Sequence, residues 1–153
     1  MNYEKVTKYS VEIRDLIKYL QFGIVRSPCF LDDGFPAFST GAVNAIRKVL
    51  SKNQNVKILL TTSHKGNYSR QQWIQIFRNR GIDHQNLDKL NDNTSNVSRM
   101  EEILSWLTEH KVSNNEAIMI IDDDKSLFDL PAALKQKLVS TSPMIGLTEE
   151  LVP

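Results

Sequence analysis

The stretch Ala117–Asp124, which reads AIMIIDDD, decides how the rest of the chain is interpreted. A continuous apolar run of this length, followed by charged residues, is typical of a parallel β-strand covered on both faces. In open α/β sheets, ligands bind beyond the carboxyl ends of the strands, where Asp122, Asp123 and Asp124 are expected. Crowded carboxylates repel one another unless a cation or protons intervene, and oxygen ligands suit Mg²⁺. The alternative is structural: Asp122 ends the strand while Asp123 or Asp124 caps a following helix.

The composition is that of one globular domain. The chain has 153 residues, 41% of them apolar and 24% charged, and a formal net charge of +1. This charge creates no global field for nucleic acid or an anionic membrane, and only a local basic patch is left for such partners. Cys29 is the only cysteine and cannot form an internal disulfide, which fits a reducing compartment. No apolar stretch is long enough to span a bilayer, and the N-terminus lacks the apolar core of a signal peptide. We therefore expect a cytoplasmic protein with no membrane partner.

The N-terminal part of the chain differs from the rest. Residues 3–20 are predicted to form an amphipathic helix, because apolar residues recur there at helical spacing. A short possible strand at residues 22–25 follows, and then a loop at residues 29–38 in which Gly34 and Pro36 favour a turn. We expect residues 1–34 to be an atypical segment, a helix plus a loop, packed on a core of residues 35–153 within a single domain.

From residue 39 onward, strands and helices are predicted to alternate. The expected elements are a helix from Ser39 or Thr40 to Lys52, a strand at Val56–Leu60, a helix from the capping box Ser69–Gln72 to Gly81, a polar surface loop at residues 84–97, a helix from the capping box Ser98–Glu101, the acidic strand, a short helix near Pro131 and a strand at Leu138–Thr141. This order predicts a three-layer, Rossmann-like α/β fold with a mainly parallel central sheet.

Two of the predicted strand ends carry side chains suited to phosphate chemistry. One strand ends in Thr61, Thr62, Ser63, His64 and Lys65, and the other in the three aspartates. Hydroxyls, backbone N–H groups and a lysine can hold a phosphoryl group, and nearby carboxylates can hold the Mg²⁺ that neutralises it. Arg99, in the first turn of the helix before the acidic strand, would add a second cation. The alternative assigns the threonines to strand propensity, Lys65 to a solvated surface and Arg99 to an ion pair with Glu101 or Glu102.

The order of these motifs resembles that of haloacid-dehalogenase-like (HAD) phosphohydrolases, and most closely the HAD domain of Swiss Army Knife RNA repair proteins. The resemblance covers roughly residues 35–150 and rests on four short motifs in sequence order. They are ILLTTSHK (residues 58–65), RMEEILSWL (residues 99–107), IMIIDDD (residues 118–124) and SPMIGLTEEL (residues 142–151). They correspond to the family's strand ending in hydroxyls, its helix with a basic residue, its acidic strand and its C-terminal signature.

The resemblance implies a role for each site residue. Thr61 or Thr62 would bind the transferring phosphoryl group, and Arg99 would steady it. Asp122 and Asp123 would bind Mg²⁺, directly or through water, and Ser63 and Lys65 would contact the substrate at the rim of the pocket. The implied function is a phosphohydrolase acting on a phosphate ester, either a phosphorylated small molecule or, by analogy with the family, a nucleic-acid terminus. The alternative is a catalytically inactive domain of this fold that binds a phosphorylated ligand or a protein partner.

The nucleophile motif departs from the family pattern. These enzymes act through a first strand ending in Asp-x-Asp, whose first Asp attacks phosphorus and whose second is the general acid and base. One degenerate candidate is Asp32-Asp33-Gly34, whose adjacent carboxylates would point to opposite faces of a regular strand. The other is Glu12-Ile13-Arg14, which lies inside the predicted N-terminal helix.

We favour the interpretation that the segment DGFPAFS, residues 33–39, corresponds to the part of the family that follows its flap. The nucleophile strand is then missing or replaced, and Asp32 is kept as the catalytic candidate. This predicts weak or lost activity, because without an attacking carboxylate no covalent intermediate can form. A phospho-accepting receiver domain does not fit, because receivers carry their acidic pair on the first strand and only about 30 residues follow the triple Asp here.

Overall fold

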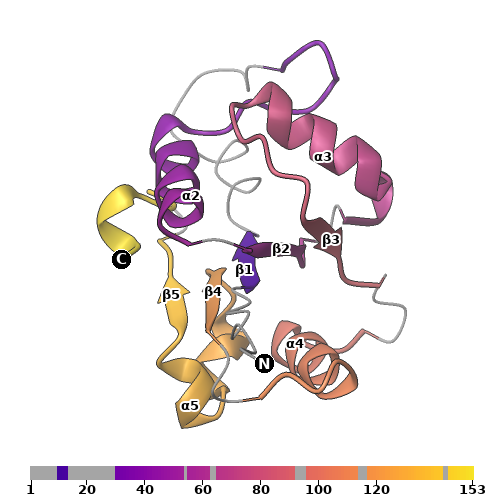
Figure 1. Ribbon diagram of the computed structural model, residues 1–153. Helices are drawn as coiled ribbons and strands as arrows, with labels where there is room; N and C mark the ends of the chain where they lie inside the picture. The colour runs from indigo at the N-terminus through magenta and orange to yellow at the C-terminus, as the bar shows by residue number, and fades with distance from the viewer. Residues whose placement is uncertain are drawn as a thin grey trace, which may run out of the picture.

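The central sheet is parallel throughout its described part. The computed structural model describes residues 10–13, 30–53, 55–62, 65–91, 96–113, 117–142 and 145–153, the first range by its backbone. Within these ranges the strands lie in the order β3-β2-β1-β4-β5 (Figure 1). They are β1 (Ser10–Ile13), β2 (Lys57–Leu60), β3 (Leu87–Lys89), β4 (Ile118–Asp122) and β5 (Leu138–Ser140). The chain thus winds outward from β1 to β3 and then crosses back to β4, which makes the end of β1 the point where the winding reverses.

Helices cover both faces of the sheet, with α2 (Thr40–Lys52) and α3 (Arg70–Asn79) on one side and α4 (Arg99–Glu109) and α5 (Ala132–Lys135) on the other (Figure 1). The strand β4 shows this in its alternation: Met119 and Ile121 pack into the core with α2 and α3, while Ile120 packs with α4 and α5. The predicted three-layer α/β fold is therefore confirmed. In the part of the chain described, no helix has the length and apolar character needed to cross a membrane.

The predicted helix starts are confirmed in their hydrogen bonds. Ser39 is the N-cap of α2 and accepts a hydrogen bond from the backbone of Ala42. Ser69 and Ser98 each form a complete capping box, with Gln72 and Glu101 respectively. These caps satisfy backbone N–H groups that have no partner inside the helix, so four-residue signals in the sequence set both starting points.

Two of the predicted elements are wrong. Ser10–Ile13 form β1, in the middle of the sheet, and not part of a helix; the other residues of the predicted helix lie outside the described ranges. Glu12 and Ile13 of the candidate Glu12-Ile13-Arg14 therefore lie on a central strand, and Arg14 lies outside the described residues. Residues 87–89 form the edge strand β3 and are not a surface loop, because Leu87 is buried against the sheet. The proposed boundary at residue 34 stays a prediction.

The other nucleophile candidate, Asp32-Asp33-Gly34, lies in a tight hairpin. A backbone hydrogen bond from Gly34 to Leu31 closes the turn, in which Gly34 has φ +76°, a conformation that glycine adopts without strain. The carboxylate of Asp33 then binds both terminal nitrogens of Arg80, at 2.6 and 2.9 Å, and the side-chain amide of Asn79 at 2.8 Å. The hairpin is thereby fixed to the C-terminal end of α3.

We expect the stability of the protein to fall in acid partly through Asp33. The bidentate hydrogen bonds from Arg80 hold the pKa of the Asp33 carboxyl well below its usual range. A carboxyl whose pKa is depressed by folding stabilises the native state above its unfolded pKa and loses that contribution as the pH falls toward the folded value. The free energy of unfolding, measured by urea titration, should therefore drop more steeply below about pH 4 in the parent than in Asp33→Asn.

The control for this measurement is Asp83→Asn, which removes a carboxylate from the exposed ion pair with Arg78. That variant should follow the pH dependence of the parent. Parallel curves for the parent and Asp33→Asn across the acid range would contradict the prediction.

Candidate functional site

The hydroxyl cluster and the acidic cluster lie at the same edge of the sheet. Leu59 of β2 and Ile120 of β4 are both in register with Glu12 of β1. Thr61 and Asp122 each lie two residues further along their strands, so they stand level on either side of β1. Two strand spacings separate them, about 10 Å between backbones. The edge therefore brings hydroxyls and carboxylates to the two sides of the central strand, as the sequence predicts.

A buried chain of charges connects the two sides of this edge. The Lys65 Nζ lies 3.3 Å from Glu102 Oε1, the other Glu102 oxygen binds Arg99 Nη1, and Arg99 Nε lies 3.8 Å from Asp122 Oδ2. The four side chains are only 0–9% exposed. The predicted alternative for Arg99, an ion pair with Glu102, is confirmed. Lys65 is not a solvated surface charge, because its side chain is 5% exposed.

Backbone contacts fix Lys65 in the short 3₁₀ helix η1 (Lys65–Asn67) that follows β2. Its N–H donates to the carbonyl of Thr62 at 3.0 Å. Its own carbonyl accepts two hydrogen bonds, from Trp73 Nε1 and from Lys89 Nζ, each at 3.1 Å. Lys65 is thus held by α3 and β3. Neither of these two elements contributes a residue to the buried chain of charges.

The three aspartates have different roles. Asp122 belongs to the site, and Asp124 caps the following helix, as the structural alternative predicted. Asp122 is almost fully buried, and its Oδ1 accepts a hydrogen bond from the backbone of Asp124 at 2.9 Å. Asp124 is the N-cap of η2 (Lys125–Asp129), where its Oδ1 accepts from the N–H of Ser126 at 2.9 Å. Asp123, between them, is half-buried. Asp124 therefore has the capping role, and Asp122 and Asp123 stay the candidates for a metal site.

The carboxylates at this edge can supply the few ligands that a protein usually gives to Mg²⁺. They do not form a complete coordination shell. No group of three or more His, Cys, Asp or Glu side chains in the described ranges is placed to hold a metal ion. Magnesium, however, usually takes only one or two carboxylates from the protein and completes its shell with water and substrate phosphate. The adjacent carboxylates of Asp122 and Asp123 can supply that share. The Arg99 guanidinium beside Asp122 would compete with Mg²⁺ for the negative charge of the Asp122 carboxylate.

Two buried hydroxyls at this edge have no hydrogen-bond partner among the described residues. They are Thr61 Oγ1 and Thr141 Oγ1. Thr141 follows β5, and its N–H donates to the carbonyl of Asp122 at 3.2 Å, so it is a direct neighbour of the acidic strand end. An unsatisfied buried hydroxyl is costly, which makes both threonines suited to a ligand that supplies the missing bond. Sequence reasoning places Thr141 on the last strand but gives no reason to include it in the site.

The structure does not bring every predicted residue to this edge. The helix α3 runs from the end of β2 back toward the start of β3, so its C-terminal end lies toward the opposite edge of the sheet. Asp33 is bound there by Asn79 and Arg80, and the exposed Asp32 is its neighbour in the same turn. Asp32 is thus separated from Thr61 and Asp122. Ser63 lies outside the described residues.

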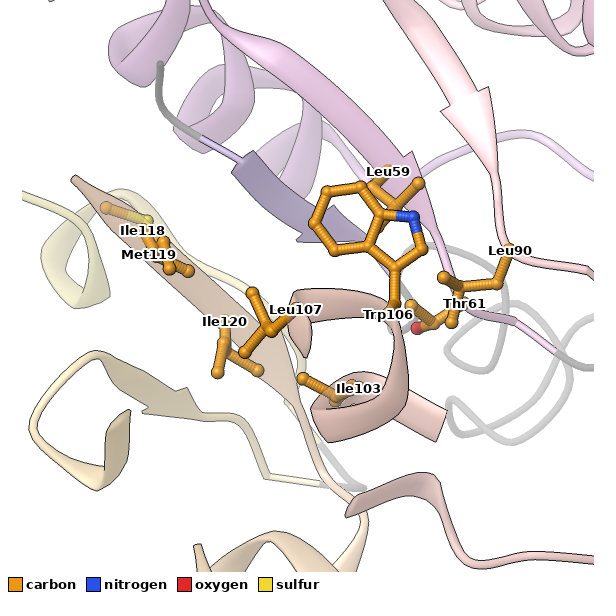
Figure 2. Close-up of a pocket in the computed structure, with 9 residues that line it drawn as sticks. All are labelled: Leu59, Thr61, Leu90, Ile103, Trp106, Leu107, Ile118, Met119 and Ile120. Atoms are coloured by element: carbon orange, nitrogen blue, oxygen red, sulfur yellow. The ribbon is translucent and has the colours of Figure 1, made fainter. Parts of the chain in front are cut away.

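An apolar pocket lies below the edge, between α4 and the sheet. Figure 2 shows it, with the ring of Trp106 reaching across toward Leu59. Its lining residues are Leu59, Thr61, Leu90, Ile103, Trp106, Leu107, Ile118, Met119 and Ile120. The polar side-chain groups among these residues are the Thr61 hydroxyl and the Trp106 indole nitrogen, and the other lining side chains are apolar. Trp106, predicted as a core residue, is half-buried at the wall of this pocket.

The sheet order defines a Rossmann-like α/β protein, and one edge of its sheet gathers hydroxyls, cations and carboxylates. A family model described as the HAD domain in Swiss Army Knife RNA repair proteins matches residues 11–152, and the chain belongs to that family. The match begins within β1, earlier than the resemblance drawn from the motifs. Comparisons with curated proteins and with solved structures gave no match. The superfamily generally uses Mg²⁺.

Proposed function

We propose that this domain binds a phosphate ester at the carboxyl edge of β2, β1 and β4, and hydrolyses it slowly. The observation that carries the proposal is the buried chain Lys65–Glu102–Arg99–Asp122, which joins two cations and two carboxylates across the edge of the sheet. Burial of four charges is costly, and such clusters concentrate at functional sites. We further propose that the domain acts in the cytoplasm.

Each residue at the edge has a role in this proposal. Thr61 and Thr62 donate hydrogen bonds to the phosphoryl oxygens, and Arg99 and Lys65 stabilise the negative charge that develops on them. Asp122 and Asp123 would hold Mg²⁺, which, when bound, neutralises the phosphoryl group and orients it. A phosphorylated small molecule or a nucleic-acid terminus would be the substrate, the latter in view of the family's description.

Slow turnover follows from the central strand. In this proposal Glu12-Ile13-Arg14, whose first two residues lie on β1, takes the place of the family's Asp-x-Asp. A glutamate has an additional methylene, and an arginine cannot serve as a general acid and base at neutral pH. This sequence also favours the second candidate function, a domain that binds a phosphorylated ligand without turning it over.

The test is hydrolysis of 4-nitrophenyl phosphate with Mg²⁺ and with EDTA, alongside calorimetric binding of phenyl phosphate. The parent should show slow, Mg²⁺-dependent turnover, and Asp122→Asn should lower it about a hundredfold, because the metal loses its buried carboxylate. Asp83→Asn, an exposed carboxylate outside the site, is the control and should leave the rate unchanged.

Two further variants identify the nucleophile. Loss of turnover in Glu12→Gln, with the unfolding midpoint unchanged, would assign the attacking carboxylate to β1. The same loss in Asp32→Asn would assign it to the hairpin instead. Metal-dependent binding of phenyl phosphate without turnover would support the second candidate function. A parent that neither binds nor hydrolyses these esters would contradict both.

A further inference from the structure

Glu102 occupies the place between the two buried cations of the site. One of its carboxylate oxygens lies 3.3 Å from Lys65 Nζ, and the other binds Arg99 Nη1. Two cations that each take one oxygen of a single anion form the arrangement that also binds a phosphoryl group. Lys65 comes from the segment after β2 and Arg99 from the first turn of α4, so the carboxylate bridges two separate elements.

The two residues that carry the cations are held by contacts that do not involve Glu102. The backbone of Lys65 is fixed by Trp73 Nε1 and Lys89 Nζ. Arg99 lies at the start of a helix set by the Ser98 capping box, and its Nε faces Asp122 at 3.8 Å. That Nε is buried and makes no hydrogen bond within the described part of the chain. The pair of cations can therefore persist, with a donor to spare, when the carboxylate moves away.

We propose that Glu102 is the resident anion of this site and that an incoming phosphoryl group displaces it. The proposal rests on the function proposed above and adds a rule of specificity. A phosphate monoester is close to a dianion at neutral pH, so it brings more charge to the two cations than the carboxylate that it replaces. A phosphodiester carries one negative charge, as Glu102 does, and gains nothing by the exchange. Glu102 thus selects terminal phosphate monoesters over internal diester linkages.

The displaced carboxylate keeps a favourable position. Glu102 lies in the first turn of α4, where negative charge interacts well with the positive end of the helix dipole. Its side chain is 9% exposed, so it is not completely enclosed. Exchange of one anion for another also avoids leaving two buried cations uncompensated, which would be strongly destabilising.

The experiment is calorimetric binding of methyl phosphate and dimethyl phosphate at pH 8 to the full chain and to Glu102→Gln. The parent should bind the monoester at least about tenfold more tightly than the diester. Glu102→Gln keeps the shape and removes the resident charge, so its affinity for the diester should rise about tenfold and the selectivity should narrow. The matched control is Glu101→Gln, which removes the same charge from the neighbouring position. A glutamine there still completes the capping box, so both affinities should stay at the parent values.

The outcomes separate the two proposals. Selectivity that is unchanged in Glu102→Gln, or affinity that falls for both esters, overturns the role of Glu102 while leaving the phosphate site intact. Binding of neither ester by any of the three proteins overturns the phosphate site itself. If Glu102→Gln does not fold, Glu102→Asp keeps the charge but draws the carboxylate back by one methylene. Glu102→Asp should also bind the diester more tightly than the parent does. The increase in affinity should be about a third of that expected for Glu102→Gln.

Discussion

Replacement of Arg80 by alanine should lower the free energy of unfolding by about 3–5 kcal/mol, a large share of the stability of a small domain. The guanidinium is almost fully buried and binds both carboxylate oxygens of Asp33. It also donates to the carbonyls of Phe35, Pro36 and Ile76, at 2.6–2.7 Å. Alanine would leave these acceptors unsatisfied and Asp33 without its cation. The free energy is measured by urea unfolding at neutral pH.

The same side chain joins the hairpin to the aromatic core, because its guanidinium carbon lies 5.2 Å from the ring centres of both Phe35 and Phe38. Arg78→Ala is the matched control, because Arg78 lies two residues earlier, in the last turn of α3. Its ion pair with Asp83 is 45% and 73% exposed, so its removal should change the free energy by less than about 0.5 kcal/mol. A loss below about 1 kcal/mol in Arg80→Ala would show that the hairpin is anchored by other contacts.

Replacement of Trp73 by alanine should cost about 3–5 kcal/mol, because it empties the position of the largest fully buried side chain described. The indole ring packs edge to face against Phe35 and Tyr68, at centroid distances of 5.4 and 5.2 Å. Its Nε1 also holds the carbonyl of Lys65. The substitution therefore removes core packing and a support of the candidate site together, and chemical unfolding measures the sum.

Trp73→Phe separates the two contributions. Phenylalanine keeps most of the packing and loses the hydrogen bond, so the cost should fall to about 1–2 kcal/mol. The carbonyl of Lys65 still accepts a hydrogen bond from Lys89 in this variant. Trp106→Ala, a half-buried tryptophan on α4, should cost clearly less than Trp73→Ala. Equal losses in the two alanine variants would mean that burial of the indole does not set the effect.

Two strands of the sheet could not be predicted from the sequence, and both are short. Ser10–Ile13 lie within a stretch whose apolar residues repeat at helical spacing, and the hydrogen bonds that make them a strand come from β2 and β4. Leu87–Lys89 are three residues at the sheet edge, paired only with β2 in the described structure. The apolar spacing around β1 is helical and β3 has one buried apolar residue, Leu87, so pairing with the neighbouring strands decides that these segments are strands.

The candidate site, like the sheet, could be predicted only in part from the sequence. The sequence places Thr61 and Asp122 at strand ends, and the fold brings them level because parallel strands end at one edge. The ion pair of Lys65 with Glu102, by contrast, joins residues 37 positions apart, and no pattern in the sequence marks Glu102 as the partner of that lysine. The separation of Asp32 from the site likewise follows from the contact between Asp33 and Arg80, 47 positions apart.

By itself, the sequence determined the alternation of strands and helices from residue 39 onward apart from β3, both capping boxes, the polar strand ends and the family. These features depend on residues within a few positions of one another, whose spacing fixes their geometry. Only the tertiary structure decided that β1 is the central strand, that Glu102 bridges two buried cations and that Arg80 anchors the hairpin. These contacts join segments distant in the chain, and the free energy that selects them comes from burial and charge pairing that exist only after the sheet has assembled.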